Sequence, residues 1–485
     1  MLFSSITFLY LFLPIVIFLY ILAPQKGRNF VLFVMSVLFY AWGEPVYVLL
    51  MLVQILAAFV LTGIMERFRG SKTGRIFYIL SVLLPFIALF YFKYYGFFME
   101  SVFGLRAKSL PLPIGISFYT FQIASYCIDV YHQRIDRQKN IITFAAYVTL
   151  FPQLVAGPIV RYSEIERTLV EGVKISDIRV SFEKGIVRFV TGLGKKVLIA
   201  NVLGEFVAEV SGLEQRTLVL SWMYAIAVAM QLYFDFSGYS DMAIGLGGMS
   251  GFSFPENFRY PFISKSVSEF WRRWHITLGT WFRDYVYIPM GGNRVRMTRW
   301  IWNIFVVWLF TGLWHGAGWN FIVWGLMFAV LLVLEKAKNT TRKFWKSSDN
   351  KIMAYTFNFI RHVYVALVII VSFLVFHNES LGAAWSDVQS LVGNGTHALK
   401  SANVTDISVC TYLLRNRIGI LCIGLVGSTP FPFWLWKQIT MRLGRNRAGD
   451  VAVYVLRGIF TVGLLILCTA YLIDGSFNPF LYFRF

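Results

Sequence analysis

Charged residues are scarce in this chain, and acidic residues are the scarcest of them. Only 14% of the 485 residues are charged, with 25 Asp and Glu against 45 Lys and Arg. Soluble domains carry roughly 25% charged residues, whereas 57% of this chain is hydrophobic. The composition therefore excludes a soluble globular protein and predicts an integral membrane protein.

The chain also has few residues that bind metals or form disulfides, with only four cysteines and six histidines. The cysteines show neither disulfide nor zinc spacing, so we interpret them as small packing residues. A metal site built from His275 and His315 would lack a third ligand at a suitable spacing. We therefore expect no metal centre.

Long apolar runs make up most of the sequence. Windows of ~20 residues predict roughly ten to twelve membrane segments, some of them too short or too interrupted by Pro and Gly to be simple spans. They lie near 6–22, 30–40, 46–64, 76–98, 114–130, 144–160, 187–207, 218–234, 302–334, 355–376, 418–435 and 451–473. Because no repeat or linker divides them, we expect one membrane domain over residues 1–485.

Basic residues gather in short loops between these runs, and the net charge is +20. The positive-inside rule explains such loops better than nucleic-acid binding does. The clusters at 26–28, 67–75, 336–346 and 437–447 are predicted to face the cytoplasm, which places both termini and loop 378–409 outside. The first run lacks a basic n-region and a small-residue cleavage site, so it is interpreted as an uncleaved span.

One histidine interrupts the apolar run 300–334, where the sequence reads Trp-His-Gly-Ala-Gly-Trp-Asn from Trp314 to Asn320. About 35 helical residues would extend ~52 Å at ~1.5 Å per residue, against ~30 Å for a bilayer core. The glycines around His315 predict a helix break that faces protein or a cavity rather than lipid. An ionisable ring at such a depth indicates a functional site by default.

Residues 255–299 form the densest cluster of basic and aromatic side chains, with eight Lys or Arg residues against three acids. This mixture is typical of the membrane interface. It would equally suit a site for a phosphate-bearing cofactor, because Arg side chains match phosphate geometry. Residues 266–281 are predicted to form one helix that carries His275, with a capping box at its start and a Glu269–Arg273 pair on its surface.

Two aspartates, Asp235 and Asp241, interrupt the apolar stretch 231–248. The backbone is predicted to turn at Gly238 within protein. A cation or proton site is one interpretation, and a helix break whose carboxylates accept backbone N–H bonds is the other.

Pro and Gly also occur at apolar depth in residues 112–122 and 151–161. They again predict broken helices. The segments bring Gln122 and Gln153 into apolar surroundings, where their amides need hydrogen-bonding partners.

These segments, taken in order, resemble the membrane-bound O-acyltransferase (MBOAT) superfamily, and within it the bacterial alginate O-acetyltransferase (AlgI-like) branch. The similar segments are LPIGISFYTFQ at 112–122, FPQLVAGPIVR at 151–161, QLYFDFSGYSDMAIGLG at 231–247, FWRRWHITLGTWFRDYVYIPMGGNR at 270–294 and GLWHGAGWNFIVWG at 312–325. The resemblance extends from the N-terminal MLFSSITFLYLFLP to the C-terminal NPFLYFRF, with a motif core at about 112–335.

The resemblance implies an all-α polytopic fold, in which a ring of tilted and broken transmembrane helices, with re-entrant and amphipathic helices, surrounds a central funnel or tunnel. It implies an acyltransferase of the bacterial plasma membrane that moves acetyl from cytoplasmic acetyl-CoA to an extracytoplasmic or cell-wall polysaccharide. No permanently bound cofactor is implied. The acceptor would be the glycan itself or an extracytoplasmic SGNH-type transferase that relays the acetyl group.

The family's Trp-His-Gly motif maps onto His315, and a second important histidine maps onto His275. On this hypothesis neutral His315 takes the proton of the acceptor hydroxyl as general base, while His275 orients the acceptor or polarises the carbonyl. The other side chains expected to bind donor or acceptor are Trp314, Trp319, Asn320, Arg272, Arg273, Trp274, Arg283, Asp235, Ser237, Tyr239 and Gln122. The chain departs from the family at Phe376-His377-Asn378, where members often carry Phe-Arg-Ala.

Two alternatives stand beside this hypothesis. A DltB-like D-alanyl transferase for teichoic acid, or a lipid or protein O-acyltransferase, would share the fold, although residues 288–294 look more like the alginate branch. An ion-coupled transporter with sites at Asp235 and Asp241 belongs to a different class, and the inverted-repeat signal that such folds often show is lacking.

Overall fold

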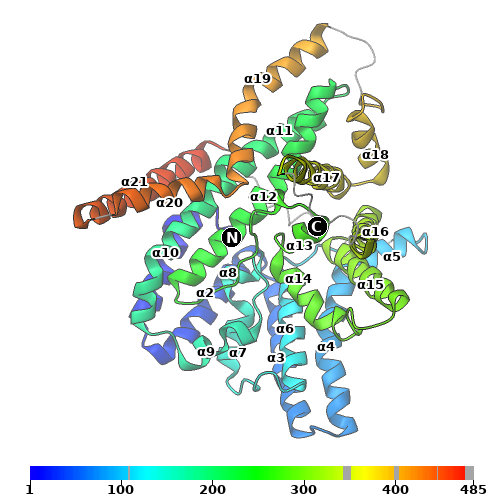
Figure 1. Ribbon diagram of the computed structural model, residues 1–485. Helices are drawn as coiled ribbons and strands as arrows, with labels where there is room; N and C mark the ends of the chain where they lie inside the picture. The colour runs from blue at the N-terminus through cyan, green and yellow to red at the C-terminus, as the bar shows by residue number, and fades with distance from the viewer. Residues whose placement is uncertain (107–109, 342–350, 398–403, 445, 476–485) are drawn as a thin grey trace. The chain divides into compact units, whose positions relative to one another are not determined.

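The computed structural model is helical wherever regular elements occur in the residues it describes, which are 1–106, 110–341, 351–397, 404–444 and 446–475 (Figure 1). Residues 342–346 of one basic cluster, Arg445 and the C-terminal NPFLYFRF motif lie outside these described ranges. The helical content confirms the predicted all-α class.

Seven helices in the described ranges are long and apolar enough to cross a membrane. They are α3 (Tyr47–Arg67), α4 (Lys72–Lys93), α12 (Leu218–Met249), α16 (Trp319–Thr341), α17 (Lys351–His377), α19 (Val404–Gly427) and α21 (Arg447–Asp474). The remaining predicted segments form shorter helices, because glycine, proline or polar loops divide them. The chain is therefore a polytopic membrane protein built from both long and broken helices.

The chain divides into two compact units, and each is described separately. Among the described residues, the first comprises Met1–Leu193, Tyr239–Glu256 and 472–475. Besides α3 and α4, its helices are α1 (Leu13–Leu22), α2 (Arg28–Gly43), α5 (Tyr95–Ser101), α6 (Ile116–Tyr131), α7 (Ile141–Thr149), α8 (Phe151–Leu154), α9 (Tyr162–Glu171) and α10 (Ile175–Gly194).

The predicted helix break in 112–122 is present just before α6. Gly115 caps α6 with φ +78°, in the left-handed region that favours glycine. A Cβ atom at this position would lie 2.5 Å from the carbonyl oxygen of Leu154, so the backbones approach too closely for any side chain. The short helix α8, with Pro152 in its first turn, confirms the second predicted break.

The second unit comprises Gly194–Gly238 and Asn257–Tyr471. Besides α16, α17, α19, the part of α12 up to Gly238 and the part of α21 up to Tyr471, its elements are the π-helical turn η3 (Lys195–Asn201), α11 (Val202–Ser211), α13 (Val267–Trp271), α14 (Ile276–Phe282), the π-helical turn η5 (Arg283–Tyr287), α15 (Met297–His315), α18 (Leu381–Ser390) and α20 (Phe431–Leu443).

Helices α15 and α16 pack with their backbones in close approach. A Cβ on Gly312 would lie 2.4 Å from the carbonyl oxygen of Phe321, and one on Gly325 would lie 2.4 Å from that of Trp308. Small residues allow such packing between membrane helices, where dispersion and close contact replace the hydrophobic effect. The two glycines therefore fix how the end of α15 meets the start of α16.

The predicted turn at Gly238 is wrong, because α12 runs unbroken from Leu218 to Met249. The polar side chains in its middle do not require a break. A continuous helix already satisfies its backbone N–H and C=O groups, and the Asp235 carboxylate is neutralised by a basic side chain from another element, as described below.

Candidate active site

His315 occupies the predicted helix break. It is the last residue of α15, and α16 begins four residues later at Trp319. Its side chain is buried, and three aromatic rings surround it, with centroids 4.9 Å (Trp314), 5.0 Å (Trp324) and 5.1 Å (Phe376) away. These rings come from α15, α16 and α17, so the packing of three helices sets the position of the imidazole.

His275 lies between two helices rather than on one, so the predicted single helix over 266–281 is wrong. Helix α13 ends at Trp271 and α14 begins at Ile276, with His275 at φ 44° and ψ 52° before it. The break has a physical cause: the Ile276 N–H donates to the backbone oxygen of Asn257 at 3.0 Å and leaves the helical pattern. A left-handed conformation is rare outside glycine and is often found at functional sites.

The predicted N-cap at Ser266 and the predicted Glu269–Arg273 pair are confirmed, but the capping box is incomplete, because Glu269 accepts from the Lys265 N–H and not from the Ser266 N–H. The Ser266 hydroxyl accepts a hydrogen bond from the Glu269 N–H at 3.0 Å. The Glu269 carboxylate accepts from the Lys265 N–H at 3.0 Å and forms an ion pair with Arg273 at 2.9 Å. These contacts fix the start of α13 and engage one of the three arginines expected at a phosphate site.

The two histidines contact the same indole. The Trp314 ring centroid lies 5.7 Å from that of His275 and 4.9 Å from that of His315. Phe236 from α12 closes over His275 at 4.7 Å. Burial lowers the pKa of His275, which lies outside the seven candidate spans, to about 3, so its imidazole is neutral at physiological pH.

A buried ion pair stands in the same unit, one residue before Phe236. The Lys196 ammonium on η3 lies 2.5 Å from the Asp235 carboxylate on α12, and both side chains are at most 3% exposed. Lys196 is a site residue that no motif singled out. The sequence feature that could have identified Lys196 is a charged residue inside the apolar run 187–207, because such a residue indicates a functional group or an ion pair.

Asp241, in the first unit, is also paired. Arg188 from α10 lies 2.6 Å from the Asp241 carboxylate and 2.6 Å from that of Glu256. Basic side chains thus engage both aspartates of the 231–248 segment. This arrangement weakens the interpretation of Asp235 and Asp241 as ion sites of a transporter.

A chain of polar contacts starts at the motif that contains His315. The Asn320 amide donates to the backbone oxygen of Asn378 at 2.9 Å, and the Asn378 amide donates to the Asp387 carboxylate at 2.9 Å. The Asp387 carboxylate in turn lies 3.1 Å from the Arg216 guanidinium, and both of these side chains are at most 5% exposed. Asn378, where the chain departs from the family pattern, therefore connects the start of α16 to α18.

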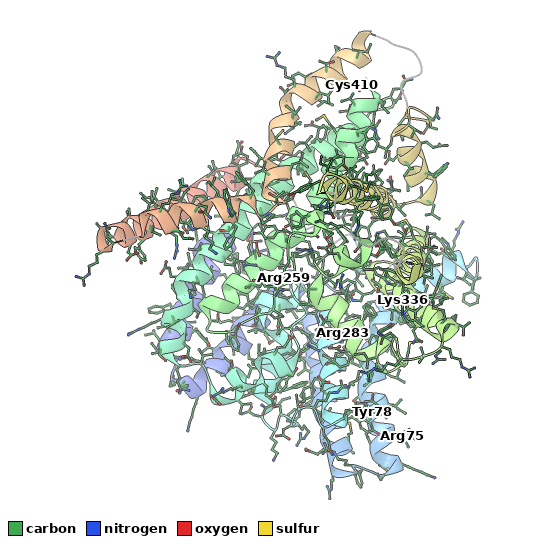
Figure 2. All side chains as sticks on the ribbon, viewed as in Figure 1. Arg75, Tyr78, Arg259, Arg283, Lys336 and Cys410 are labelled. Carbon is green, nitrogen blue, oxygen red and sulfur yellow. The ribbon has the colours of Figure 1, made fainter. Side chains whose placement is uncertain are left out.

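The other predicted site residues differ in exposure. Trp274 is buried among aromatic rings and stacks on Phe270 at 5.5 Å, whereas Trp319 is 52% exposed. Arg272 is exposed, and Arg283, labelled in Figure 2, is exposed beside Asp284 at 2.7 Å. The geometry thus favours a packing role for Trp274.

Three predicted polar residues are buried in their own units. Ser237 lies in the second unit, and its hydroxyl has no hydrogen-bond partner among the described residues. In the first unit, Tyr239 stacks on Phe3 at 4.6 Å, and the Gln122 amide is likewise unpartnered within the described ranges. Burying an amide or a hydroxyl without a hydrogen-bond partner costs free energy, so Ser237 and Gln122 stay candidates for binding a polar group.

The family model described as "MBOAT, membrane-bound O-acyltransferase family" matches residues 81–376. This range includes the two buried imidazoles that contact one indole. The helical membrane scaffold that holds them is therefore the scaffold of a membrane acyltransferase. The match covers more than half of the chain, and the chain belongs to the MBOAT family.

Three relatives illustrate the similarity. The chain is 38% identical over 431 residues to "Probable alginate O-acetylase AlgI" of Pseudomonas aeruginosa, covering 86% of this chain and 80% of that protein. It is 35% identical to the protein of the same name from Azotobacter vinelandii, with both chains covered completely. It is 33% identical to "Peptidoglycan O-acetyltransferase" of Helicobacter pylori, covering 83% of this chain and 82% of the relative.

Proposed function

We propose that this enzyme transfers an acetyl group from cytoplasmic acetyl-CoA to an extracytoplasmic or cell-wall polysaccharide in the bacterial plasma membrane. The contact of His275 and His315 with one indole, that of Trp314, carries the proposal. It puts two imidazoles within one buried site of a chain whose relatives are named as O-acetylating enzymes. The acceptor is an alginate-like glycan, reached directly or through an SGNH-type transferase.

His315 acts as the general base in this proposal. The acceptor hydroxyl oxygen attacks the thioester carbonyl carbon while the imidazole takes the hydroxyl proton. The C–S bond then breaks, and His315 returns the proton to the departing CoA thiolate. The surrounding rings of Trp324 and Phe376 keep water away from the thioester, which limits its hydrolysis.

The donor side is proposed to face the cytoplasm, where Arg272 and Arg283 are exposed arginines that could bind the CoA phosphates. Because the basic loops at 26–28, 67–75, 336–346 and 437–447 are expected inside, we further propose that the N- and C-termini lie outside the cytoplasm.

The function is tested with purified protein in liposomes, acetyl-CoA labelled on the acetyl group, and a glycan acceptor added with or without an SGNH-type transferase. Label on the glycan is expected with wild-type protein, and His315→Gln should lower the rate about 10²–10⁴-fold, the usual contribution of a general base. His132→Gln, which changes an exposed histidine, is the matched control.

Two outcomes would contradict the proposal. If His315→Gln inserts normally and transfers acetyl at the wild-type rate, His315 is not the base. If D-alanine from a carrier protein labels the acceptor and acetyl-CoA does not, the donor assignment is wrong.

A further inference from the structure

The orientation of His275 follows from the groups around its Nδ1 atom. Nδ1 lies 3.0 Å from the Asn257 Oδ1 atom, and both side chains are at most 1% exposed. The same Oδ1 atom accepts from the Thr277 hydroxyl at 2.9 Å and from the Thr277 backbone N–H at 3.4 Å. A backbone N–H can only donate, so the Asn257 atom at this junction is the carbonyl oxygen.

The tautomer of His275 is then determined. A carbonyl oxygen can only accept, so Nδ1 must carry the hydrogen that it donates to Asn257. In a neutral imidazole the other nitrogen, Nε2, is left with a lone pair. That Nε2 atom is buried and has no hydrogen-bond partner among the described residues.

We propose that Asn257 is a positioning residue that holds His275 in the Nδ1–H tautomer, so that Nε2 accepts a hydrogen bond from an O–H or N–H group of a bound substrate. An acceptor nitrogen cannot polarise the thioester carbonyl, which requires a donor. Of the two roles considered for His275, the geometry therefore favours the binding and orientation of a donor group.

This inference rests on the proposed acetyl transfer for the identity of the substrate. Because the attacking hydroxyl gives its proton to His315, the group bound at His275 is a second donor. Two sources have this chemistry: a neighbouring hydroxyl of the glycan acceptor, and an amide N–H in the pantetheine arm of acetyl-CoA.

The first experiment reads the tautomer without reference to activity. The protein is labelled with ¹⁵N-histidine, and ring nitrogen shifts are recorded in liposomes by solid-state NMR, with His275→Gln identifying its signals among the six histidines. A protonated Nδ1 with an unprotonated Nε2 is expected for wild-type protein. Asn257→Ala should move His275 toward the Nε2–H form. An Nε2–H signal in the wild type, or no change in Asn257→Ala, overturns the proposal.

The second experiment measures acetyl transfer. Asn257→Ala keeps the main-chain bond to Ile276, so the local fold retains one anchor. We expect it to lower kcat/KM about 10–100-fold, as loss of a partner that orients an imidazole does elsewhere. Asn257→Asp restores an oxygen that accepts from Nδ1 and should recover most of the activity, which a merely structural defect would not allow.

The source of the bound donor is read from the Michaelis constants of Asn257→Ala. A raised KM for acetyl-CoA assigns the donor to the pantetheine arm, and a raised KM for the glycan assigns it to the sugar. The matched control is Thr280→Val, since within the described part of the chain the Thr280 hydroxyl bonds only inside α14, to the Ile276 oxygen at 2.8 Å. Wild-type kinetics in Asn257→Ala would contradict the proposal, whereas a wild-type enzyme without acetyl transfer would contradict the proposed function and leave the NMR result intact.

Discussion

His275 and His315 are buried to a similar degree, 1% and 4% exposed, but different forces hold them. A side-chain amide and a left-handed backbone orient His275. Three aromatic rings from three helices surround His315. A hydrogen bond fixes the direction of a lone pair, whereas ring packing mainly fixes a position. One hydrogen-bonding neighbour therefore sets the direction of the His275 ring, whereas the rings around His315 depend on how α15, α16 and α17 pack.

The strongest way to break the packed arrangement is to separate α15 from α16. Gly312→Ala would bring a methyl group within 2.4 Å of the Phe321 carbonyl oxygen. The backbone must move to relieve this clash, so we expect most of the protein not to fold. We also expect activity to fall more than about 100-fold, because a displaced His315 would lose its contribution as general base. Gly463→Ala on α21 has open space around it and is the control. Equal thermal stability of the two variants would contradict the close packing.

A smaller disturbance removes one of the rings around His315. Phe376→Ala should lower the free energy of unfolding by about 3–5 kcal/mol, the usual cost of truncating a buried phenylalanine. Phe359→Ala changes a residue on the same helix α17 that is 69% exposed, and should cost far less. Thermal unfolding in detergent, with acetyl transfer measured on the folded fraction, compares the two. A Phe376→Ala protein as stable as Phe359→Ala would show that this ring does not support His315.

The polar contacts that run from Asn320 to Arg216 allow a test of whether hydrogen bonds also stabilise the region next to His315. Asp387→Asn leaves the buried Arg216 guanidinium without a counter-charge, and we expect a loss of about 1–3 kcal/mol in stability. Asp284→Asn, in an exposed pair with Arg283, should change stability by about 0–1 kcal/mol. Chemical denaturation of both variants measures the difference. If Asp387→Asn is as stable as wild type, the chain from Asn320 to Arg216 is not a structural support.

The smallest expected effect is the change in stability when the pH is lowered by one unit. The pKa of His275 is near 3 in the folded protein, against about 6.5 in the unfolded chain. The unfolded state therefore binds more protons between these values, and stability falls as pH drops below about 6.5, by at most about 1.4 kcal/mol per pH unit. His275→Gln should flatten this dependence in thermal unfolding, and His132→Gln should not. An unchanged slope in His275→Gln would mean that His275 is not held neutral.

The sequence predicted the surroundings of His315 better than those of His275. Apolar length and flanking glycines are local signals, and they located the end of α15 correctly. The break before His275 depends on Asn257, eighteen residues earlier in the chain, and no local pattern reports such a bond. The capping by Ser266 and the Glu269–Arg273 pair were predictable because both lie within one helical turn.

The same distinction explains the segment around Asp235. A carboxylate and glycine inside an apolar run predicted a break, since an unpaired charge would not be tolerated there. The partner, Lys196, comes from a different helix, and with it α12 continues through Gly238. The family resemblance could identify the two histidines but gave no partner for either of them. Contacts between residues that are far apart in the chain could not be predicted from the sequence alone.

The uninterrupted length of α12 connects catalysis to the host membrane. Its 32 residues extend about 48 Å at ~1.5 Å per residue, against ~30 Å for a typical hydrocarbon core. A straight helix of that length must lean or project into the headgroup region, and hydrophobic mismatch then sets the angle. Because Asp235 and Phe236 lie on α12, we expect bilayer thickness to influence the contact between Phe236 and His275.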